Sequence, residues 1–227
     1  PTAFVLMYGG GISIRMLGLL VGEGLLLVGI VLGIFLLPEK LGAGEEAQDR
    51  IVRSIGLSPY HRDRVVYFLE PDKDPLGAGW NKIQSEIAVG SGGVWGKGWK
   101  EGRQNILGFL PRTVTPTDFI YSVIAEEKGF FGSLCILVLF GLLIGFGMQV
   151  AFMARDMMGR LLCVGVTGLI FCHAFINIAM TIGLMPITGL PLPLLSYGGS
   201  FMVVTMSGLG MIQSVYVRSL LRRQTYI

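Results

Sequence analysis

Asp118 is an acidic residue that could take part in proton transfer. It lies in TPTDFIYSVIAEE, residues 115–127, where Thr117 or Asp118 is placed to cap a helix that starts near Phe119. The following residues give that helix an apolar face. A carboxylate at a helix start, partly shielded by apolar neighbours, can act as a general base or simply as a cap. The pattern leaves both roles open.

A glycine-rich basic segment precedes this acid. Residues 77–102 contain eight glycines, and Lys97, Lys100 and Arg103 lie among or just after them. Backbone N–H groups of tight glycine turns can hold anions, and basic side chains would add charge for a phosphate or pyrophosphate. The alternative is a flexible loop with solvated charges. No nucleotide-binding signature such as GxxxxGK[ST] is present to decide between them.

Metal and disulfide chemistry has little support. The two histidines, His61 and His173, fall on different sides of the predicted topology, which argues against a histidine-based metal site. The three cysteines lie inside apolar segments with no metal or disulfide spacing, so we predict inert buried thiols at Cys135, Cys163 and Cys172.

The elements that must position these residues are membrane helices. Only 15% of residues are charged and the mean hydropathy is +0.66, whereas soluble domains carry about 25% charged residues. We predict an all-α polytopic membrane protein with about four full transmembrane helices plus the end of a fifth, in one membrane domain over residues 1–227. The full spans are expected at 17–37, 130–153, 161–185 and about 197–217.

Two further features of the chain bear on this prediction. Residues 1–14 are apolar but too short to span, so they are interpreted as the end of an earlier helix in a longer protein. Gly141 and Gly145 have the small-residue spacing that lets helices approach closely.

Basic residues in the short connections predict the orientation. By the positive-inside rule, cytoplasmic sites are expected where they gather, at Arg15, Arg155, Arg160, Arg218, Arg222 and Arg223. The C-terminus is then cytoplasmic. The 38–117 loop and the 186–196 loop are extracytoplasmic, so an enzyme acting outside the cytoplasm would use them.

Several long strings resemble the SEDS family of shape, elongation, division and sporulation proteins, closest to its RodA branch rather than FtsW. They are YHRDRV (60–65), DPLGAG (74–79), QSEIAVGSGGVWGKGW (84–99), TDFIYSVIAEE (117–127) and NIAMTIGLMPITGLPLPLLSYGGS (177–200). The chain departs from the family pattern at Pro116, where a histidine is usual, and at His61, where a glutamine is usual.

The resemblance implies a peptidoglycan glycosyltransferase of the bacterial plasma membrane. Such a protein polymerises lipid II into glycan strands, here for cell elongation, beside a class B penicillin-binding protein that cross-links them. Asp118 would be the general base. Membrane lipids are expected as further partners, and nucleic acid is not. A divalent cation, Mg²⁺ or Mn²⁺, could share the charge of the pyrophosphate, although no dedicated ligand cluster is visible. Candidate substrate-binding residues are Arg62, Arg64, Lys97, Arg103, Gln104, Ser196, Gly198 and Gly199.

Two other functions fit a multi-span architecture. The first is a lipid II flippase, which should need ionisable groups along the spans. Only Glu23 and His173 qualify, and His173 could instead bond Asn177 one turn on. The second is a non-catalytic membrane scaffold for the penicillin-binding protein.

Overall fold

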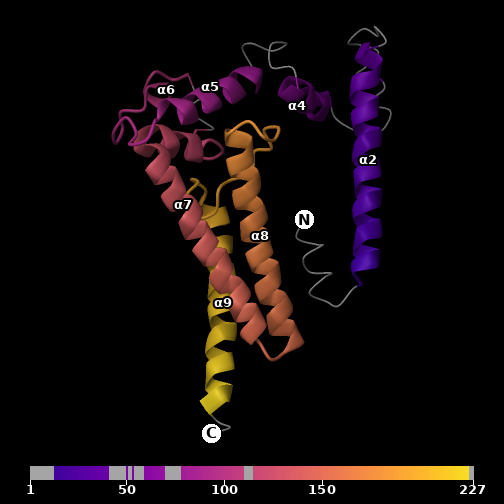
Figure 1. Cartoon of the computed structure of the whole chain (residues 1–227), viewed down its shortest axis with the longest axis vertical. Coiled ribbons are helices and arrows are strands. Elements are labelled where there is room, and N and C mark those ends of the chain that lie inside the picture. Colours follow the sequence, from indigo (N-terminus) through magenta and orange to yellow (C-terminus); the bar gives the residue numbers. More distant parts are fainter. Residues whose placement is uncertain are drawn as a thin grey trace. The chain divides into compact units, whose positions relative to one another are not determined.

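The computed structural model describes residues 13–40, 50, 53, 59–69, 78–109 and 115–224. Within these ranges the chain is helical, without strands (Figure 1). It divides into two compact units, one of residues 13–83 and one of the described residues from Gln84 onward. The helices are α2 (Ile14–Lys40), α4 (Pro59–Leu69), α5 (Ala78–Ser91), α6 (Arg103–Ile106), α7 (Ile120–Met153), α8 (Met157–Thr181) and α9 (Gly199–Gln224).

Three described helices are long and apolar enough to cross a membrane: Ile120–Met153, Met157–Thr181 and Gly199–Leu221. Helix α2 adds a shorter apolar stretch, Val21–Gly33. This composition confirms the predicted all-α polytopic fold class. The predicted end of a fifth helix falls on residues 1–12, outside the described residues, and the single membrane domain over 1–227 stays a prediction.

The predicted boundaries of α8 were wrong by four residues at each end. The helix runs over Met157–Thr181 rather than 161–185 because Asp156 caps it, accepting a hydrogen bond from the Gly159 N–H at 2.7 Å. At the other end, Gly183 adopts a positive φ of 77° and the Leu184 N–H turns back to the Ala179 carbonyl. This left-handed glycine ends the helix before residue 185.

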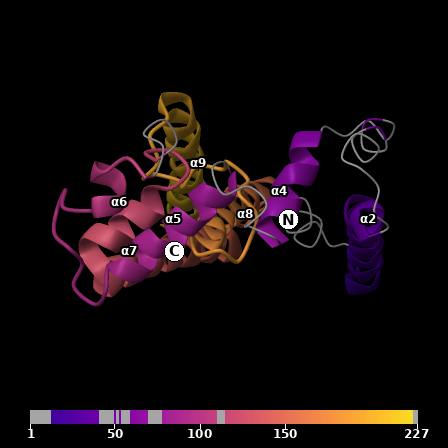
Figure 2. The ribbon, with the colours of Figure 1, turned by 90° about the horizontal axis from the view of Figure 1, so that it is seen from above.

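Helices α7, α8 and α9 run alongside one another (Figures 1 and 2). Their interior is apolar, and two buried clusters, one around Phe140 and Ile170 and one around Val150 and Cys163, fill it. Close approach between α7 and α8 occurs at Gly147, where a Cβ would lie 2.2 Å from Thr167 Oγ1. The predicted contact glycines, Gly141 and Gly145, have open space instead.

Two of the cysteines match their prediction and one does not. Cys163 and Cys172 are buried, whereas Cys135 is exposed on the outside of α7. A membrane helix is apolar both on its buried face and on the face that it turns toward lipid. Apolar sequence alone therefore did not distinguish a buried cysteine from a lipid-facing one.

Short helices of the long loop lie at the end of this bundle where α7 begins. Helices α5 and α6 lie beside the start of α7 (Figure 1). Ser85 of α5 bonds Ser122 of α7, with 2.7 Å between the two Oγ atoms, and donates to the Thr181 carbonyl of α8 at 2.8 Å. One buried serine therefore ties the loop to two membrane helices at the level of Asp118.

Candidate functional site

Asp118 lies in a turn directly before α7, and the helix does not use it as a cap. The N-cap residue is Phe119, and no side chain makes a capping hydrogen bond there. The predicted N-cap position, at Thr117 or Asp118, was therefore wrong. Phe119 takes this position because its ring is only 1% exposed and packs against Ala88 and Ile187. Burial of the ring fixes where the helix starts.

The backbone of the turn is held at successive carbonyl groups. The Tyr197 N–H donates to the Pro116 carbonyl at 2.9 Å, and the Ser196 hydroxyl donates to the Thr117 carbonyl. Both donors come from the loop between α8 and α9. The turn before α7 is therefore fixed by a segment about eighty residues later in the chain.

Asn177 supplies the third bond, to Asp118 itself. Its Nδ2 donates to the Asp118 carbonyl at 3.0 Å and to the Leu190 carbonyl at 2.7 Å. The side chain is fully buried. The predicted bond between His173 and Asn177 is absent, since the amide nitrogen serves these two carbonyls and His173 Nδ1 has no partner among the described residues. Instead the His173 ring lies 5.1 Å from the Phe201 ring, measured between centroids.

These contacts all involve the backbone, and the carboxylate of Asp118 takes no part in them. The residue is half-buried, and no described residue makes a hydrogen bond or ion pair with its side chain. A carboxylate with a fixed backbone and unoccupied oxygens can accept a proton from a bound hydroxyl. This geometry favours a chemical role over a structural one.

Glu126 of α7, unlike Asp118, has a carboxylate that is paired with a cation. Glu126 is 0% exposed, and its Oε1 lies 2.7 Å from Lys97 Nζ, whose side chain is 27% exposed. The same oxygen accepts the Gln104 N–H at 3.2 Å, and Lys97 also donates to Ser91 Oγ at 2.7 Å. Glu126 Oε2 has no partner among the described residues. A buried carboxylate paired in this way stabilises the loop against α7 but would be costly to leave unpaired.

The glycine-rich segment does not form the predicted anion nest. The N–H groups of Gly96, Lys97 and Gly98 donate to the carbonyls of Gly92, Glu126 and Glu127, so they are unavailable to a phosphate. The alternative of a loose flexible loop does not fit residues 93–98 either, because four backbone hydrogen bonds join them to α7.

Glycine is required here for close approach. A Cβ at Gly92 would lie 2.0 Å from the Ala125 carbonyl oxygen, and one at Gly96 would lie 2.2 Å from that of Glu127. On the helix side Gly129 has a φ of 65° and kinks α7, and the next N–H groups, of Phe130 and Phe131, donate to loop carbonyls. The glycines therefore let two backbones touch.

The remaining predicted residues lie on different elements of the chain. Arg103 begins α6 and is exposed, and the Gln104 side-chain oxygen is buried without a partner among the described residues. Gly198 and Gly199 lead into α9. Arg62 and Arg64 lie on α4, in the first unit. Contact of any of these residues with substrate stays a prediction.

Among the described residues, no three or more His, Cys, Asp or Glu side chains group as a metal site. The side chains near Asp118 therefore do not fit a cation held by protein ligands alone.

Sequence reasoning missed Asn177 and Glu126 as positioning residues. A signal was present for each, since Asn177 is a lone amide in an apolar span and Glu126 directly precedes one. The sequence did not show which residues form hydrogen bonds or ion pairs with these two side chains.

Comparisons with known proteins show the family to which the chain belongs. The family model FtsW/RodA/SpoVE, described as "Cell cycle protein", matches residues 2–220. The chain is 48% identical over 157 residues to the peptidoglycan glycosyltransferase MrdB of Escherichia coli (strain K12), covering 69% of this chain and 42% of that relative. It is 43% identical over 164 residues to the peptidoglycan glycosyltransferase RodA of Treponema pallidum, covering 72% of this chain and 37% of the relative.

One solved structure is similar over nearly the whole chain. It is described as "Structural coordination of polymerization and crosslinking by a peptidoglycan synthase complex", with a TM-score of 0.61 and 29% identity, covering 96% of this chain and 53% of that one. The chain thus spans less than half the length of the two curated relatives named above.

Proposed function

We propose that this chain, which belongs to the FtsW/RodA/SpoVE family of cell cycle proteins, is part of a peptidoglycan glycosyltransferase that polymerises lipid II for cell elongation. The observation that carries the proposal is the Asp118 carboxylate, which no described residue occupies, above a backbone fixed by Asn177 and Ser196. The names of similar proteins support the reaction class.

In the proposed reaction, Asp118 takes the proton of the acceptor sugar's 4-hydroxyl. The hydroxyl oxygen forms a bond to the anomeric carbon of the donor, and the bond from that carbon to the lipid-linked pyrophosphate breaks. Because Asn177 and Ser196 hold the turn, the base would be positioned before substrate arrives.

The leaving pyrophosphate needs positive charge. Lys97 is paired with Glu126. Among the described candidates, the exposed Arg103 is therefore favoured as the residue that contacts the pyrophosphate. Arg62 and Arg64 are proposed to contribute as well. A requirement for Mg²⁺ or Mn²⁺ stays a prediction, and no step is assigned to the cation.

The proposed location is the bacterial plasma membrane, with the 38–117 loop and Asp118 on the extracytoplasmic face and the C-terminus in the cytoplasm. A class B penicillin-binding protein is the proposed partner, because the similar solved structure is a synthase complex that couples polymerisation to cross-linking.

The test is polymer formation from lipid II by purified full-length protein in detergent, with and without its transpeptidase partner. We expect glycan strands on gel electrophoresis, in the absence of any bilayer across which lipid could move. Movement of dye-labelled lipid II across vesicles without polymer would establish the flippase instead. Absence of both activities, with the transpeptidase still bound, would establish the scaffold.

Asn177→Ala is expected to slow polymerisation through the position of Asp118. Loss of the amide leaves the Asp118 and Leu190 carbonyls unpaired, and a displaced base can reduce the rate about 100-fold. We expect kcat to fall with KM little changed, in steady-state assays with lipid II.

Asn81→Ala is the control, since Asn81 is a half-buried asparagine of α5 without a described partner. Equal losses in the two variants, or a rise in KM alone for Asn177→Ala, would exclude the positioning role.

A further inference from the structure

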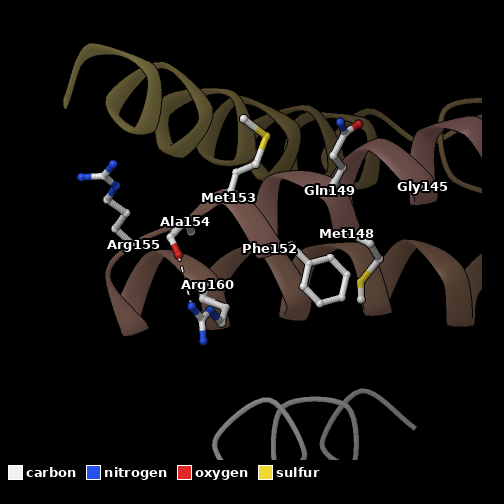
Figure 3. Close-up of a pocket in the computed structure, with 8 residues that line it drawn as sticks. All are labelled: Gly145, Met148, Gln149, Phe152, Met153, Ala154, Arg155 and Arg160. Atoms are coloured by element: carbon white, nitrogen blue, oxygen red, sulfur yellow. Dashed lines mark hydrogen bonds between the residues drawn. The ribbon is translucent and has the colours of Figure 1, made fainter. Parts of the chain in front are cut away.

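An open groove of about 710 Å³ lies where α7 ends, at the far end of that helix from Asp118. Figure 3 shows Met148 and Phe152 side by side along α7, with Arg160 beyond them and Arg155 extending past the helix end. Phe152 is 79% exposed on a helix apolar enough to cross a membrane. One wall of the groove therefore presents apolar surface to the membrane and the end presents charge.

Positive charge exceeds negative charge among the described residues at this end. Arg155 has no hydrogen bond or ion pair among them, and Arg160 has one contact, from Nη2 to the Ala154 carbonyl at 3.4 Å. Arg218 of α9 lies with Arg155 around an adjoining pocket. The neighbouring acid, Asp156, accepts the Gly159 N–H as the cap of α8. Three arginines are thus set against one carboxylate, which leaves a net positive charge.

We infer that this groove binds an anionic phospholipid of the membrane. The phosphate lies against the guanidinium groups of Arg160 and Arg155, and an acyl chain follows Met148 and Phe152 along α7. Arginine forms paired hydrogen bonds with phosphate oxygens. A soluble anion would use the charge but not the apolar wall, whereas a phospholipid matches both. The inference is independent of the proposed function, because the groove and Asp118 are at opposite ends of α7.

The experiment measures lipid binding to the full-length protein rather than activity. Phosphatidylglycerol is titrated into protein held in phosphatidylcholine nanodiscs, and bound lipid is counted by native mass spectrometry. We expect wild type to retain phosphatidylglycerol preferentially, and Arg155→Gln/Arg160→Gln to bind it about 30-fold more weakly, from about 1 kcal/mol per basic residue. Both side chains are exposed, so the variant should keep its fold, which circular dichroism checks.

The matched control removes two charges elsewhere, Arg15→Gln/Lys100→Gln, and should bind phosphatidylglycerol as wild type does. Equal weakening in the two double variants would show that net charge, not the groove, governs binding. Unchanged binding in Arg155→Gln/Arg160→Gln would overturn the site. Displacement of phosphatidylglycerol by millimolar inorganic phosphate would show a simple anion site and overturn the lipid assignment.

Discussion

Asp118→Asn is expected to lower the rate of lipid II polymerisation by about 100-fold or more, the range over which a general base contributes. The amide keeps the shape of the side chain but cannot take the hydroxyl proton. Fold and substrate affinity should be preserved, because the described contacts of this residue involve its carbonyl and not its carboxylate. The measurement is the initial rate of glycan formation at saturating lipid II, with the partner present.

Glu101→Gln is the matched control. Glu101 is an exposed carboxylate of the segment that precedes α7 in the chain, so its loss removes equal charge without touching the turn before α7. We expect wild-type rates. If Asp118→Asn polymerised lipid II as fast as Glu101→Gln does, Asp118 would not be the base and the mechanism proposed here would be wrong.

Lys97→Met is expected to give the largest loss of stability. The substitution keeps most of the apolar stem but leaves Glu126, which is 0% exposed, without its cation. Removing one partner of a buried ion pair costs roughly 3–5 kcal/mol, and we expect about 3 kcal/mol because Lys97 is partly exposed. Thermal unfolding of the full-length protein in detergent provides the measurement.

A second variant separates the ion pair from the lysine's other contacts. Lys97→Met/Glu126→Gln should regain most of the lost stability, since a neutral amide at 126 needs no cation and can still accept the Gln104 N–H. Lys100→Met, which removes an exposed charge three residues away, should change the free energy of unfolding by about 0.5 kcal/mol or less. No recovery in the double variant would contradict the ion-pair explanation.

This stability prediction bears on the substrate candidates. If Lys97 held the pyrophosphate, its loss would raise KM in a protein of normal stability. The ion pair with Glu126 predicts instead that loss of Lys97 lowers the stability of the protein, and that any change in substrate affinity is secondary to this loss. Arg103→Gln, by contrast, should raise KM without destabilising the loop.

Membrane helices were predictable from this sequence because their cause is local. A bilayer requires about twenty consecutive apolar residues, and such runs are visible without knowing what they contact. The span predicted at 130–153 matches the part of α7 after the kink at Gly129. The short helix predicted near Phe119 matches the part before it. The strings shared with the SEDS family are also contiguous in the sequence, and for this reason they could indicate Asp118 without any knowledge of its contacts.

Contacts between distant segments decided the rest. The sequence could not show that Lys97 lies against Glu126, that Asn177 holds the Asp118 carbonyl, or that Gly147 rather than Gly141 packs against α8. Each depends on which faces of separate helices meet, and apolar composition is similar on all faces of a membrane helix. By itself the sequence determined a polytopic helical protein with an acid, Asp118, at the start of a helix. The tertiary structure decided that no described residue occupies the carboxylate of this acid. Hydrogen bonds from residues 59 to 81 positions away hold the backbone of the turn that carries it, at Pro116, Thr117 and Asp118.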